Sequence, residues 1–285
     1  MRCLFTNKAT NSKEHVIPDW LQRRFNLSEQ TLRIPNGTLL QYKHHCVPAD
    51  SNANQRFGEI ERRISQGILD PAEVYLWALK IHIGCIYRDG SILTNRRDPT
   101  SPTVIDVSKF SDEVWIFQQL FDIWSNGGST NPSPFGSVFI LDSLHPSPCF
   151  DFMHCLMTGT VGIDIGGKFI LVFLWDQGDA THSSILESWE NYHVPNVISF
   201  SESKDFQSYC YAAHRTWACE SAYNIYRIRR SISMFKTPTE LVLLPSLTPP
   251  SPKPHSEAEL NYICSSFGLK LVEYKGEVSN IYRLS

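Results

Sequence analysis

The stretch SKEHVIPDWL, residues 12–21, places an acid directly before a histidine, with a proline three residues after that histidine. Two interpretations of this stretch are open. In the first, Glu14 is an acid near the start of a short helix that has Pro18 in its first turn, and His15 is a half-buried histidine. In the second, Glu14 and His15 are a metal ligand and a general base. The choice depends on whether the chain supplies matching groups further along.

A second stretch, HHCVPADSNANQRFGEIE, supplies such groups over residues 44–61. Asp50 and Ser51 are typical residues for the start of a helix. Apolar residues then recur at helical spacing, at Phe57, Ile60 and Ile64, which predicts an amphipathic helix. Asn54 lies near the start of this helix, either as its cap or as a ligand.

Together, in this order, the two stretches resemble the HNH endonucleases, the ββα-metal nucleases. Many members of that family carry EHVIPxWL followed by C-x-x-C-N-x-x-F-G-x-x-E. This chain has EHVIPDWL and DSNANQRFGEIE, with the second pair of cysteines replaced. The resemblance covers residues 3–63, under a quarter of the chain.

The resemblance implies roles for three residues. His15 falls on the general base, Glu14 on the first metal ligand, and Asn54 on the metal ligand carried by the helix. Neighbouring side chains on a regular strand point to opposite faces, so Glu14 and His15 can serve one site only at a strand end or bulge.

Further positions are implied as supporting ones. His45 falls on the middle position, which orients the base or contacts the phosphate, with His44 as the alternative. Glu61 and Arg56 are candidate supporting residues, although Glu61 is expected to pair with backbone or with Arg62 rather than with metal. Some relatives place a second histidine one turn after the helix ligand, where this chain has a glycine, Gly58.

Phosphodiester hydrolysis needs a deprotonated water in line with the leaving oxygen, and positive charge on the developing phosphorane. An imidazole accepts a proton at neutral pH. A carboxylate and an amide oxygen favour Mg²⁺ or Mn²⁺ over Zn²⁺ and leave positions open for phosphate oxygens. The resemblance therefore implies one such ion per site.

A structural zinc ion is not expected. Where relatives carry two C-x-x-C pairs, this chain has Cys3-Leu4-Phe5-Thr6 and Asp50-Ser51-Asn52-Ala53, so tetrahedral zinc lacks ligands. An improvised site from Cys3, Cys46, His44 and His45 is the alternative. We expect packing to hold this module instead, through Leu4, Phe5, Val16, Ile17, Trp20, Phe57 and Ile60.

The charge distribution and the cysteines indicate which partners and which cellular compartment to expect. The first 65 residues carry ten Lys and Arg against six acids, whereas the whole chain has a net charge of −3. A basic N-terminal segment fits phosphate binding. The eight cysteines form no C-x-x-C pair, and no apolar run is long enough to span a membrane. We expect free thiols, a cytoplasmic protein and no membrane partner.

The rest of the chain predicts further elements. Two short strands about an Asn-Gly turn are expected over 31–42. An apolar helix is expected over 70–90 and an amphipathic one over 109–124, followed by strands between about 135 and 175 with a hairpin at Gly166 and Gly167. Helices are also expected around 203–215, 217–235 and 256–268. The last strand is expected at either KLVEYKG (270–276) or NIYRL (280–284). The fold class is α+β: an HNH-like module over 1–65, a helical connecting region over 66–130, and an α+β domain over 131–285 with an antiparallel-type sheet.

The functional expectation is a metal-dependent endonuclease that hydrolyses nucleic acid, with DNA favoured over RNA. By analogy with the family, the chain acts in phage defence with a partner ATPase or sensor protein. Two rivals remain open. One is a degenerate scaffold that keeps the fold and binds nucleic acid or protein without the chemistry, and the other is an effector whose C-terminal region gates the nuclease.

Overall fold

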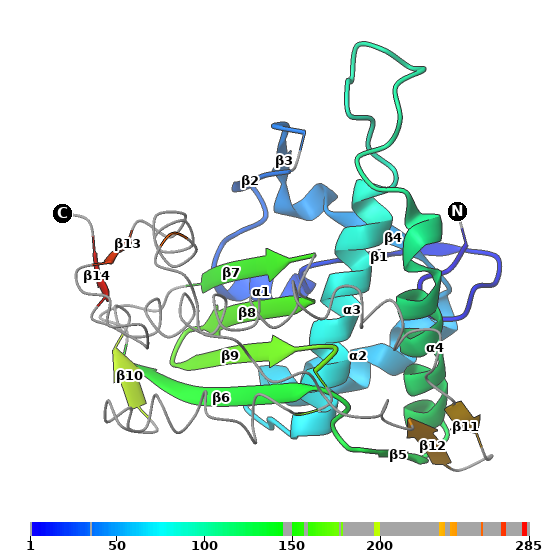
Figure 1. Cartoon of the computed structure of the whole chain (residues 1–285), viewed down its shortest axis with the longest axis vertical. Helices are drawn as coiled ribbons and strands as arrows, with labels where there is room; N and C mark the ends of the chain where they lie inside the picture. The colour runs from blue at the N-terminus through cyan, green and yellow to red at the C-terminus, as the bar shows by residue number, and fades with distance from the viewer. Residues whose placement is uncertain are drawn as a thin grey trace. The chain divides into compact units, whose positions relative to one another are not determined.

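The computed structural model describes residues 2–34, 36–144, 150–156, 159–176 and 178, with residue 258 and short strands towards the C-terminus (Figure 1). The fold is mixed α+β with small, mainly antiparallel sheets. The chain forms two compact units, residues 1–133 with 235–242, and residues 134–234 with 243–285. The segments predicted as 1–65 and 66–130 therefore lie together in the first unit.

Two antiparallel strands followed by a helix open the first unit. β1 (Ser12–His15) pairs with β4 (Cys46–Ala49), and β4 leads directly into α2 (Ser51–Ser65). Asp50 caps α2 by accepting hydrogen bonds from the backbone N–H groups of Asn52 and Ala53, at 3.1 and 3.0 Å. The cap predicted at Asp50 is confirmed, and Asn54 is not the cap.

The segment between β1 and β4 follows the sequence expectations closely. Helix α1 (Asp19–Arg24) begins after Pro18, and β2 (Thr31–Arg33) pairs antiparallel with β3 (Leu39–Gln41). Gly37 in the intervening turn has a φ of +80°, which glycine adopts without a steric penalty. A 3₁₀ turn, η1 (Tyr42–His44), then leads into β4.

Two long helices complete the core of the first unit. From Glu73 onward every residue of α3 (Pro71–Asp89) is buried, which explains its almost continuous apolar sequence. α4 (Ser111–Ser125) follows the short turn η2 (Val107–Phe110). Aromatic rings of three segments pack together at centroid distances of 5.1 to 6.4 Å: Phe5, Phe57, Phe117 and Phe121. Of the seven residues expected to hold the module by packing, Trp20 is half-buried and the others are buried.

This unit also contains a small three-stranded sheet. β12 (Glu240–Leu243) pairs in parallel with β5 (Ser129–Asn131), and β11 (Met234–Lys236) lies on the other side of β12. The sheet brings a segment from late in the chain beside the end of α4.

The second unit is built on a five-stranded sheet of order β10-β6-β9-β8-β7. Its strands are β6 (Ser137–Leu144), β7 (Phe150–Cys155), β8 (Thr160–Ile165), β9 (Lys168–Phe173) and β10 (Val197–Ser199). All pairs are antiparallel except β10 with β6. Gly166 and Gly167 have φ values of +77° and +112° between β8 and β9, which confirms the predicted hairpin.

The end of the chain differs from expectation where it is described. Both candidate final strands form, and they pair antiparallel as β13 (Leu269–Leu271) and β14 (Ile281–Arg283). The helix predicted over 203–215 lies outside the described residues. So do those over 217–235 and 256–268, apart from the start of β11 and residue 258.

Candidate functional site

β1 ends at His15. A strand end at this position is what allows Glu14 and His15 to serve one site. Glu14 is opposite Val47 and His15 is opposite Cys46 in the register of β1 with β4. The burial alternates, with Glu14 only 8% exposed and His15 half-buried. The Glu14 carboxylate is thus directed into the first unit, whereas the imidazole is accessible. The His15 side chain has no hydrogen-bond or ion-pair partner among the described residues.

The buried partner of Glu14 is Lys80, in the middle of α3. Lys80 has no solvent exposure, and its ammonium group forms ion pairs with the carboxylates of Glu14 and Glu61, the second at 3.1 Å. The same group donates a hydrogen bond to the backbone oxygen of His15 at 2.6 Å. An ammonium group has three N–H donors, so these three acceptors satisfy it. We call Glu14, Lys80 and Glu61 the acid–lysine cluster.

Burial and charge set the protonation of this cluster. Burial raises the pKa of the Glu61 carboxyl to about 7, against the opposing effect of the Lys80 ammonium and with the help of the Glu14 carboxylate. Burial disfavours the charge of Lys80, but the carboxylates of Glu14 and Glu61 outweigh it and raise the pKa of Lys80. Two carboxylates around one ammonium carry a net charge of −1 when all three are ionised, and protonation of Glu61 removes it.

Asn54 is the fourth residue of α2 and is half-buried. Its side chain makes no hydrogen bond with any residue in the described ranges. Asn54 and Glu61 are seven residues apart, about two helical turns, so they lie on the same flank of α2. On that flank Glu61 forms its ion pair with Lys80, which also pairs with Glu14.

Gly58 lies on the same flank, one turn after Asn54. It is exposed, and a Cβ atom built on it meets no atom within 4 Å. The position where some relatives of the resembled family carry a second histidine is therefore open space here.

His45 is fully buried and differs from the other candidates. The Arg88 guanidinium of α3 donates a hydrogen bond to its Nε2 atom, and Arg88 also pairs with Asp89 at 2.5 Å. Because a guanidinium group can only donate, Nε2 is an acceptor and the ring proton is on Nδ1. His45 therefore anchors β4 to α3, out of reach of a phosphate in solvent. The alternative, His44, is exposed in η1.

Neither Glu61 nor Arg56 has the neighbours that the sequence predicts for a supporting residue of the site. The expected pairing of Glu61 with Arg62 is wrong, because Arg62 pairs with Glu59 at 3.0 Å and Glu61 pairs with Lys80. Arg56 is exposed and lies on the flank of α2 away from Asn54, where it lines a cavity.

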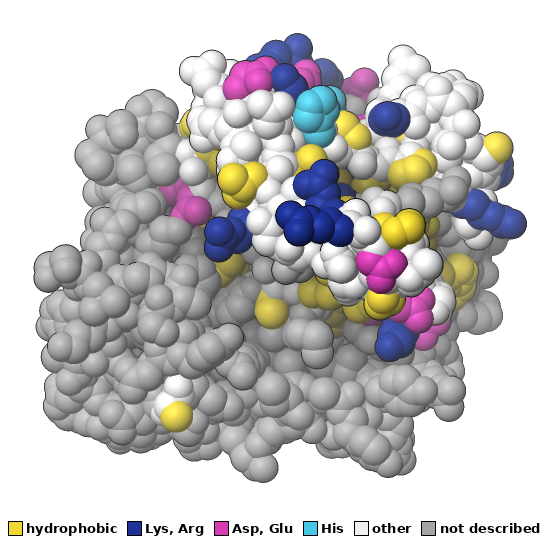
Figure 2. Space-filling view, turned by 90° about the horizontal axis from the view of Figure 1, so that it is seen from above, with side chains coloured by type: hydrophobic (Ala, Val, Ile, Leu, Met, Phe, Trp, Pro, Cys, Tyr) yellow, Lys and Arg dark blue, Asp and Glu magenta, His cyan; other side chains and the backbone are white. Residues whose placement is uncertain are grey.

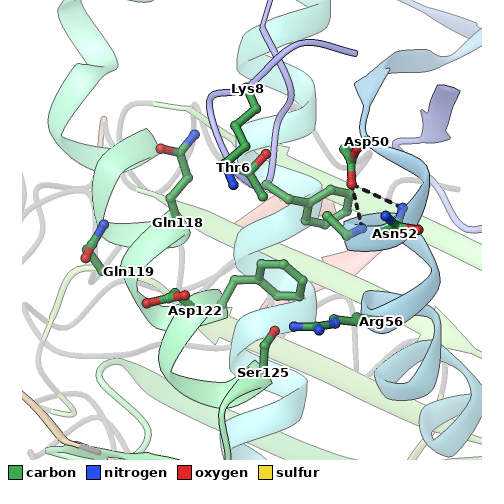
Figure 3. A pocket seen from close by; sticks show the side chains of 12 residues that line it. Thr6, Lys8, Asp50, Asn52, Arg56, Gln118, Gln119, Asp122 and Ser125 are labelled. Carbon is green, nitrogen blue, oxygen red and sulfur yellow. Dashed lines mark hydrogen bonds between the residues drawn. The ribbon is translucent and has the colours of Figure 1, made fainter. Parts of the chain in front are cut away.

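That cavity lies beside the corner formed by residues 3–6 and 50–53, where the resembled family carries its cysteine pairs. Cys3 is buried and its Sγ accepts a hydrogen bond from the backbone N–H of Asp50 at 3.1 Å. Thr6, Asp50 and Ala53 line the cavity, of about 500 Å³, together with residues of α4 (Figure 3). Cys3 is therefore packed in this corner, while a cavity adjoins Thr6, Asp50 and Ala53. The four cysteines in the described ranges are free thiols, namely Cys3, Cys46, Cys85 and Cys155.

The donor set fits a weakly held hard cation better than a closed metal site. Among the described residues, no three histidine, cysteine or acidic side chains converge as metal ligands. The Glu14 carboxylate and the Asn54 amide are oxygen donors, and Mg²⁺ is commonly held by one or two carboxylates plus substrate phosphates. The Lys80 ammonium beside Glu14 reduces the attraction of that carboxylate for a second cation.

Sequence reasoning missed Lys80 and Arg88, both on α3. The signal was present, because a single lysine within YLWALKIHIG is a charge in an otherwise apolar helix. Such a charge is almost never fully buried unless it is paired, so an acidic partner elsewhere in the chain was required.

Comparisons with known proteins give no further guide. No protein-family model, no curated protein and no solved structure matches this chain. Within the ranges that the structure describes, no helix has the length and apolar character needed to cross a membrane.

Proposed function

We propose that this protein is a metal-dependent endonuclease that hydrolyses phosphodiester bonds, with DNA as the favoured substrate. The observation that carries the proposal is the order β1–β4–α2 with His15 at the strand end and Asn54 one turn into the helix. Both side chains are partly exposed and without partners in the described part of the chain. The arrangement supports a ββα nuclease module.

In this proposal His15 is the general base. Its imidazole, which has no competing hydrogen bond with a described residue, accepts the proton from an attacking water. The Lys80 contact with its backbone oxygen holds the strand end in place. A base within hydrogen-bond reach of the water accounts for about 10²–10⁴-fold of the rate.

Glu14 and Asn54 would hold a divalent cation. The ion, when bound, supplies positive charge to the phosphate and to the leaving oxygen. Asn54 contributes a neutral amide oxygen from the flank of α2. Glu14 contributes a carboxylate whose orientation is fixed by Lys80. Glu61 pairs with the same lysine, so its protonation changes the net charge of the acid–lysine cluster next to the site.

The charge of the first unit supports a polyanionic substrate. Lys13 and Arg33 are exposed and form no ion pair with another described residue. Figure 2 shows Lys and Arg side chains, in dark blue, near an exposed histidine on the face seen from above, with Asp and Glu side chains, in magenta, among them. Cations that are not already paired attract phosphates without giving up an internal ion pair. A role in phage defence with a partner ATPase or sensor protein is part of the same proposal and rests on the resemblance alone.

The test is a nicking assay on supercoiled plasmid with the full chain, in Mg²⁺, in Mn²⁺ and in EDTA. The proposal expects nicking in the metal lanes and none in EDTA, with His45→Gln as a comparison for a buried structural histidine. Nicking that is equal in EDTA would contradict a metal-dependent mechanism.

A second candidate is a scaffold that binds nucleic acid without cutting it. The ion pair of Glu14 with the buried Lys80 favours it, because that lysine neutralises the one carboxylate expected to hold metal. In this case the chain retards DNA in a gel-shift assay at low salt, yet nicks it in none of the metal lanes.

A further inference from the structure

The cavity on the other flank of α2 is separate from the proposed cleavage site. Asn52 and Arg56 line it from α2, four residues apart on one face, whereas Asn54 and Glu61 lie on the opposite flank. Gln118, Gln119, Asp122 and Ser125 line it from α4, and the lining also includes Phe5 and Phe121. Its volume, about 500 Å³, is within the range of small-molecule sites.

Two cations of this cavity are available to an anion. Lys8 and Arg56 are exposed, and neither forms an ion pair or side-chain hydrogen bond with another described residue. Figure 3 shows Arg56 extending from α2 towards Ser125 of α4, with Lys8 reaching in from the N-terminal segment. One of the two acids in the lining, Asp50, already accepts two backbone N–H groups at the start of α2.

Two hydroxyl groups in the lining are unsatisfied. Thr6 Oγ1 and Ser125 Oγ are shielded from solvent and have no hydrogen-bond partner among the described residues. A buried hydroxyl without a partner costs free energy, which a polar ligand in the cavity would recover. The Asn52 amide adds a donor and an acceptor at the same place, and the Gln118 amide, whose Nε2 donates to the backbone oxygen of Leu4 at 3.2 Å, adds its oxygen as an acceptor.

An exposed tryptophan continues the α4 side of the cavity. Trp115 is 47% exposed, which is unusual for so large an apolar side chain. It precedes Gln118, Gln119 and Asp122 by three, four and seven residues, so it lies on the same face of α4, about one turn from the cavity lining. An exposed indole on the helix face that lines a cavity with two unpaired cations suits a single strand, because bases stack on the ring and phosphates pair with the cations.

We propose that this cavity and Trp115 bind one nucleotide unit. Lys8 and Arg56 hold the phosphate, the amides and hydroxyls contact the sugar, and the base stacks on the indole. The unit comes either from a nucleic-acid strand or from a free nucleotide. The strand as its source rests on the proposed function, whereas nucleotide binding itself does not require cleavage.

The experiment measures binding by the full chain in EDTA, so that cleavage plays no part. The probes are a fluorescein-labelled single-stranded oligonucleotide, followed by anisotropy, and a nucleoside monophosphate, followed by calorimetry. The variants are Trp115→Ala, Trp115→Phe and the double variant Lys8→Gln/Arg56→Gln. Leu39→Ala and Lys109→Gln/Arg97→Gln are matched exposed controls away from the cavity.

Trp115→Ala should weaken binding by at least about fivefold, the lower limit for removal of a base–aromatic stack, and Trp115→Phe should restore most of it. The double variant should weaken binding at least about tenfold. For a single strand, it should also lower the salt dependence by about 0.7 for each phosphate that is no longer neutralised. Effects on the oligonucleotide alone identify a strand as the source, and effects on both probes identify a site for the free unit.

Binding of both probes that matches the wild type in all three cavity variants would overturn the proposal. So would equal decreases in the control variants, or binding of neither probe by the wild type, in which case the exposed indole is left to a protein contact. A His15→Ala variant that cannot cleave but binds both probes normally would separate this proposal from the proposed function.

Discussion

The ammonium group of Lys80 donates a hydrogen bond to the backbone oxygen of His15 at 2.6 Å. This contact joins the middle of a buried helix to the last residue of the strand that carries the proposed base. Because the same ammonium group pairs with Glu14 and Glu61, one side chain fixes both the strand end and the carboxylates around it. The acid–lysine cluster therefore holds the strand end in place and sets the net charge next to the candidate site.

Replacement of Lys80 by methionine should lower the free energy of unfolding by about 3–5 kcal/mol, since breaking a buried ion pair leaves an uncompensated charge. Urea unfolding at pH 8, followed by circular dichroism, measures the change. The triple variant Glu14→Gln/Lys80→Met/Glu61→Gln should recover most of this stability, because no buried charge remains. A decrease below about 1 kcal/mol in Lys80→Met would show that the cluster is not closed to water.

Glu61 should make the stability of the protein fall as the pH rises from about 4.5 to about 7. The folded chain keeps a proton on this carboxyl up to about pH 7, whereas its ordinary pKa is 4.5. The folded state then binds more protons in this window, so the free energy of unfolding decreases through it. Urea unfolding across this window should show the free energy of unfolding of the wild type falling by on the order of 3 kcal/mol. The Glu61→Gln variant should not show this decrease. Parallel curves for the two proteins would contradict the raised pKa.

The open space at Gly58 offers a gain-of-function test of the proposed metal site. Gly58→His adds an imidazole on the Asn54 flank, at a position without steric conflict. Imidazole favours Ni²⁺ and similar ions over Mg²⁺, so the Ni²⁺ concentration for half-maximal nicking should fall several-fold relative to Mg²⁺. Gly58→Ala is the control, because it adds about 0.8–1.0 kcal/mol of helix propensity without a ligand. The same shift in both variants would argue against a metal at this flank.

Asn54→Ala and Glu14→Gln should raise the Mg²⁺ concentration needed for cleavage by different amounts. Glu14→Gln removes a charged oxygen ligand and should have the larger effect, whereas Asn54→Ala removes a neutral amide. Nicking rates over a Mg²⁺ titration at fixed pH measure both. Stability must be measured alongside, because Glu14 also pairs with Lys80. Unchanged Mg²⁺ dependence in both variants would remove them from the metal site.

Much of the fold could be predicted from local signals. Asp50 before an amphipathic pattern marked the start of α2, the Asn-Gly pair marked the β2–β3 turn, and Gly166 with Gly167 marked the β8–β9 hairpin. These features depend on a few neighbouring residues, whose backbone preferences are strong. The pairing of β13 with β14 was missed because only one of the two runs was expected to form the last strand.

The candidate site was predictable only in part, because its electrostatics depend on residues far apart in sequence. Glu14, Lys80 and Glu61 come from β1, α3 and α2, and no local pattern joins them. Glu61 was assigned to neighbouring backbone or to Arg62, yet side chains at adjacent helix positions do not face each other. His45 was assigned by its place in a motif, and its burial against Arg88 was set by the packing of α3.

The most direct measurement is the nicking rate of His15→Ala against that of the wild type, at saturating Mg²⁺ and over a pH series. The account predicts a wild-type rate that depends on a general base to take the proton of the attacking water. The variant should cut about 10²–10⁴-fold more slowly, with its metal and nucleic-acid binding nearly unchanged. A variant that cuts at the wild-type rate, with the same pH profile, would contradict His15 as the base.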